Sequence, residues 1–105
     1  MANKRKYIER LKLAVEHLHR CSAVHVRTES VHERFKDQTV WRGEVEIFDL
    51  TGHPKAKRAY GWSHAEGRDD TGERFVTVLE IPPVESAETA VRVQIVKDVK
   101  SGYSK

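Results

Sequence analysis

Cysteine is nearly absent from this sequence: Cys21 is the only one in 105 residues, which excludes an intramolecular disulfide. A lone thiol is typical of proteins in a reducing compartment, so we expect a cytoplasmic protein. Long apolar runs are also lacking, and none approaches the ~18 residues that a membrane-spanning helix needs. The sequence therefore predicts a protein that neither depends on disulfides nor contacts a membrane.

Motifs that identify many enzymes and cofactor-binding proteins are missing as well. There is no glycine-rich phosphate loop and no nucleophile-elbow pattern around a serine. His17 and Cys21 are one helical turn apart, as metal ligands can be, but no second pair completes a tetrahedral site. We expect no metal, no cofactor and no catalytic residue. The enzyme alternative would need a pocket near His53, His64 or Cys21.

The composition is that of one globular domain. Charged residues make up 33% of the chain and hydrophobic residues 38%, which separates it from disordered chains. Its length suits a single domain over residues 1–105, with a frayed tail from about residue 101. The net charge of +3 permits contact with nucleic acid without requiring it.

Hydrophobic periodicity predicts the order of helices and strands. The expected elements are a helix over 3–20, a strand over 23–30 that continues to a turn at 36–37, a hairpin over 40–64, a strand over 74–81 and a helix from Ser86. In the fourth strand, Val76 and Val78 lie on the face opposite the main apolar one, which indicates cover on both sides or an interface. The order α-β-β-β-β-α predicts an α+β two-layer sandwich. In it, an antiparallel sheet of three to four strands carries both terminal helices on one face.

The hairpin register decides which side chains share a face. A three-residue loop closed by Gly52 would pair Ile47 with Lys55 and Trp41 with Gly61. Because side chains alternate along a strand, this register predicts one apolar face suited to a helix and one open face.

The open face is the main candidate for binding. It would carry Arg42, Arg58, Tyr60, Trp62 and His64. Exposed aromatic rings and arginine are typical anchors of protein interfaces, and the same groups can stack on bases and pair with phosphate. We expect a small non-catalytic binding module whose partner is another protein or a second copy in a homodimer. Weak binding of nucleic acid, single-stranded or RNA, is the alternative, and a small enzyme or ligand-binding domain comes third.

The hairpin tip is a second candidate. His53, Lys55 and Lys57 surround the turn glycine and could contact an anion. Polar residues also occur at hairpin tips for structural reasons alone, so the same pattern fits a tip without a ligand.

Overall fold

The computed structural model describes residues 2–66 and 72–100. The elements are α1 (Ala2–His19), β1 (Ser22–Phe35), β2 (Gln38–Thr51), β3 (Arg58–Glu66), β4 (Gly72–Leu79) and α2 (Ala87–Lys100). The strands form one antiparallel sheet in the order β1-β2-β3-β4. The predicted α+β class, element order and antiparallel sheet are confirmed. The predicted tail from residue 101 lies outside the described residues.

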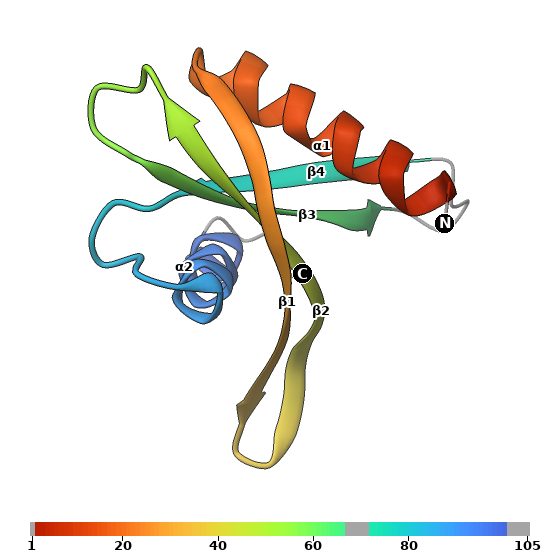
Figure 1. Ribbon diagram of the computed structural model, residues 1–105. Helices are drawn as coiled ribbons and strands as arrows, with labels where there is room; N and C mark the ends of the chain where they lie inside the picture. The colour runs from red at the N-terminus through yellow and green to blue at the C-terminus, as the bar shows by residue number, and fades with distance from the viewer. Residues whose placement is uncertain (1, 67–71, 101–105) are drawn as a thin grey trace.

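The two helices pack on opposite faces of the sheet, with β3 and β4 between them (Figure 1). Leu11 of α1 belongs to one buried cluster with Ala59, whereas Val91 of α2 belongs to another with Tyr60. Since consecutive residues of a strand point to opposite faces, these two clusters lie on different sides of β3. The predicted placement of both helices on one face is therefore wrong, and the sheet is covered from both sides.

The hairpin register differs from the predicted one. Ile47 pairs with Tyr60 rather than with Lys55, a shift of five residues. Because the shift is an odd number of residues, each face of β2 lies beside the face of β3 opposite to the predicted one. Trp41 and Ile47 therefore share a face with Tyr60. The physical reason is a longer loop: β2 ends at Thr51, β3 begins at Arg58, and Ala56 of the loop is buried.

Gly61 lets α1 lie close to the sheet. A methyl group at this position would come within 3.2 Å of three side-chain carbons of Leu11. As expected, a helix packs on the small residues of the hairpin. It contacts them through Leu11, on the face of the sheet opposite the one that carries Trp41.

Beyond β3, the strands β1 and β2 continue together as a two-stranded ribbon (Figure 1). β2 pairs with β3 only from Glu46 to Asp49, whereas its pairing with β1 runs on to Gln38. The ribbon turns at Lys36 and Asp37, which have φ of 53° and 66°, so the predicted turn is confirmed.

The base of the ribbon is braced against the rest of the domain. The Trp41 ring packs edge-on against the Trp62 ring at a centroid distance of 5.6 Å. Arg92 of α2 donates a hydrogen bond of 2.6 Å to Glu33 of β1. Neither contact extends to the tip, where Phe35 and Val40 are exposed.

Candidate functional site

The structure separates the five residues expected to share an open face. Tyr60 and Trp62 are 2% and 3% exposed and belong to the cluster packed under α2. Arg42 is exposed on the ribbon and lines a hollow of about 400 Å³ there. Arg58 is half-buried near the β2–β3 loop. His64 of β3 pairs with Arg74 of β4, and the His64 side chain lies outside the described part of the chain. The expectation of one exposed aromatic face is therefore wrong.

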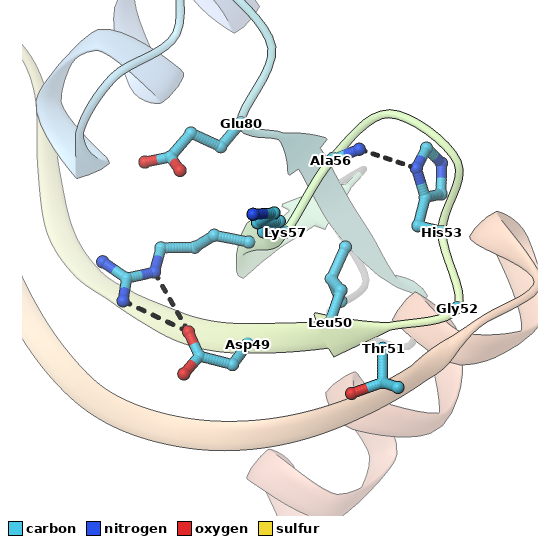
Figure 2. Close-up of a pocket in the computed structure, with 9 residues that line it drawn as sticks. Asp49, Leu50, Thr51, Gly52, His53, Ala56, Lys57 and Glu80 are labelled. Carbon is cyan, nitrogen blue, oxygen red and sulfur yellow. Dashed lines mark hydrogen bonds and ion pairs between the residues drawn. The ribbon is translucent and has the colours of Figure 1, made fainter.

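Arg58 instead lines an open groove of about 800 Å³ between the β2–β3 loop and the end of β4. Figure 2 shows Asp49 of β2 on one wall and Glu80, just after β4, on the opposite wall. Glu80 is held there because its backbone N–H donates a 2.9 Å hydrogen bond to the Arg58 carbonyl, which extends the β3–β4 ladder by one residue.

Both acids of this groove accept a hydrogen bond from a β3 side chain. Arg58 donates a hydrogen bond of 3.2 Å to Asp49, and the Tyr60 hydroxyl donates one of 2.6 Å to Glu80. Partial burial opposes the charge on Arg58, but the hydrogen bond and charge of Asp49, together with the charges of Glu80 and Tyr60, raise the Arg58 pKa. Burial and the bond to Glu80 raise the Tyr60 pKa above its ordinary value. With acids beside the arginine, the groove suits a partner surface that presents charges of both signs.

The hairpin-tip residues are only partly brought together. His53 and Lys57 line the groove, whereas Lys55 is exposed outside its lining. The Nδ1 atom of His53 accepts backbone N–H bonds of 3.0 Å from Lys55 and 2.9 Å from Ala56. Figure 2 shows the imidazole turned back toward Ala56. The His53 ring therefore serves to fix the loop.

His53 also meets α1. Its ring packs edge-on against His19, with the centroids 6.4 Å apart, and His19 forms a 2.7 Å hydrogen bond with Thr77. Burial, followed by the charge of His53, lowers the His19 pKa. This pair links the loop to the end of α1.

Cys21 and the lining of the groove bear on the enzyme alternative. Cys21 is half-buried, and burial together with nearby Glu16 raises its pKa, which disfavours the reactive thiolate. The enzyme alternative needs a pocket near His53, His64 or Cys21; His53 lines the groove, and Cys21 does not. Within residues 2–66 and 72–100, no group of three metal-type side chains could hold an ion.

Sequence reasoning missed the outer edge of β1. β1 is the first strand of the sheet and pairs only with β2. The Ala23 amide donates to the Glu16 carboxylate, but no backbone group on the outer edge from Val24 to Phe35 has a partner among the described residues. Val24 and Val26 are 63% and 40% exposed along this strand. Such an edge is a template for pairing with another chain.

Comparison with protein-family models, with curated proteins and with solved structures gave no match.

Proposed function

We propose that this domain is a non-catalytic, cytoplasmic protein-binding module. Its contact surface runs along the outer edge of β1 and across the adjoining groove. The observation that carries the proposal is the open edge of a strand of 14 residues. Unpaired backbone N–H and C=O groups bind an added strand by main-chain hydrogen bonds. The single cysteine is the feature that supports a cytoplasmic location.

The groove and the edge are continuous, which supports a shared role. Val24 of β1 is the cross-strand partner of Asp49, and Asp49 in turn pairs with Arg58. An exposed valine therefore lies next to an accessible ion pair, whose acid is 56% exposed and whose arginine is 32% exposed. An apolar spot with charged groups at its rim is typical of a protein interface.

The nucleic-acid alternative has less support from the charges. The rings expected to stack on bases, Tyr60 and Trp62, are buried. α1 also carries basic side chains, but Lys4 forms a 2.8 Å ion pair with Glu44. Lys12 lies 3.5 Å from Glu16. These acids reduce the positive potential that α1 can offer to a phosphate backbone.

Position-specific photo-crosslinking in the native host cell tests the proposal. A photoreactive phenylalanine analogue replaces Val24 in one variant and Leu13, which is 55% exposed on α1, in the control. We expect a discrete protein adduct from position 24 that position 13 does not give. Equal adducts from both positions, no adduct from position 24, or an adduct removed by ribonuclease would overturn the proposal.

A further inference from the structure

The outer edge of β1 contains one regular stretch that another strand could pair with. Register shifts interrupt the β1–β2 ladder between His25 and Arg27 and between Glu33 and Arg34. Bulges of this kind disturb an edge and hinder pairing. The seven residues between the breaks, 27–33, have no such interruption and span roughly 20 Å.

This stretch is complementary to itself in an antiparallel pairing. We infer that the partner of the β1 edge is a second copy of this chain, paired antiparallel over residues 27–33 with Ser30 on the twofold axis. The inference rests on the proposed function and specifies its partner. An isologous contact of this kind closes a dimer and joins the two sheets into one.

Charge selects this register among its neighbours. With Ser30 on the axis, Arg27 lies opposite Glu33 of the partner subunit, and the contact occurs twice by symmetry. Moving the axis to Val31 would place Glu29 opposite Glu33 of the partner subunit, and moving it to Glu29 would place that residue opposite its own copy. Opposite charges stabilise a cross-strand pair, and like charges destabilise it.

The side chain of Arg27 is accessible for such a pair, whereas that of Glu33 is only 10% exposed. Arg27 is exposed, and within its own chain it contacts Glu29 at 2.8 Å. Glu33 binds Arg92 through one oxygen, Oε1. Arg27 of the partner subunit would approach a carboxylate that α2 already fixes in place, which limits the entropy lost on pairing.

The same arrangement covers exposed apolar groups at both ends of the pairing. Phe35, which is 64% exposed at the ribbon tip, would lie alongside the start of β1 in the partner subunit. Val24 and Val26 are at that end of the strand. Each copy contributes this contact once, so two apolar patches are removed from water.

A cysteine crosslink tests both the partner and the register. In a Cys21→Ser background, Ser30→Cys puts thiols face to face across the axis, with Cβ atoms about 5 Å apart. His32→Cys is the matched control, because its two copies would be about 13 Å apart. Mild oxidation is expected to give a covalent dimer from Ser30→Cys and none from His32→Cys. Crosslinking of both variants to the same extent, or of neither, overturns the inference.

Light scattering on a sizing column supplies an independent readout. The unmodified protein is expected to dimerise as its concentration rises, and Arg27→Glu is expected to weaken dimerisation about tenfold or more. Lys97→Glu, the same charge change on the exposed side of α2, is expected to leave it unchanged. A monomer at every concentration, together with a specific adduct from position 24 to another protein, would overturn the inference and leave the proposed function standing.

Discussion

Replacing Trp62 by alanine tests the hairpin register through the stability of the fold. The Trp62 ring is 3% exposed, lies in the cluster under α2 and packs edge-on against Trp41. Truncating a buried tryptophan removes its transfer free energy and leaves a cavity, and typically costs about 3–5 kcal/mol. A domain of this size is stable by roughly 5–15 kcal/mol, so we expect a loss of about a fifth or more of its free energy of unfolding.

The assay is urea denaturation followed by circular dichroism at two concentrations of the protein. Leu18→Ala is the matched control, because this side chain is 61% exposed on α1 and its loss should change the stability by less than about 0.5 kcal/mol. A cost below about 1 kcal/mol for Trp62→Ala would refute the reasoning. It would mean that Trp62 faces solvent and that Ile47 does not pair with Tyr60.

Three further predictions concern burial and titration. The raised Tyr60 pKa means that its neutral form contributes stability below about pH 10, and this contribution is lost as the pH rises toward the folded-state pKa. Tyr60→Phe should therefore cost about 1–3 kcal/mol at pH 7 and flatten the alkaline decline in denaturation midpoints. The lowered His19 pKa means that the unfolded chain takes up the proton first, so stability should fall from about pH 7 to 5, and less so in His19→Gln. Gly61→Val should cost about 1–3 kcal/mol in thermal denaturation, because its side chain would collide with Leu11.

The helices and strands could be predicted because their signals are local. Alternation along β1 and the Lys36–Asp37 pair predict the strand and the turn that the structure contains. Ser86 is expected to begin the last helix, and its Oγ accepts a 3.2 Å hydrogen bond from the Thr89 amide. Each of these features depends only on residues within a few positions of each other.

The hairpin register could not be predicted because the loop is longer than the standard hairpin turns and is held by hydrogen bonds particular to it. The loop is held by the imidazole of His53, which accepts two backbone N–H bonds, and by the Leu50 amide, which donates a 2.8 Å bond to the Lys57 carbonyl. General turn rules favour a shorter loop closed at Gly52. The predicted register differs from the observed one by an odd number of residues. It therefore placed Tyr60 and Trp62 on an exposed face, whereas in the structure they are buried.

One signal in the sequence did point to the correct answer. Val76 and Val78 on the second face of β4 indicate cover on both sides, and Val76 is 8% exposed in the cluster with α2. Taken together with the large apolar area of Tyr60 and Trp62, these valines favour a second covered face. The open β1 edge was out of reach, because it depends on strand order, which periodicity does not determine.

Hydrogen–deuterium exchange along β1, measured in dilute and in concentrated protein, tests the central claim most directly. Alternate backbone amides of residues 27–33 point away from β2, and in a free edge they should exchange rapidly. The account predicts that these amides gain protection as the protein concentration rises, while the amides of α1 are unaffected. Rapid exchange of the outward amides at every concentration would contradict pairing of this edge between two copies.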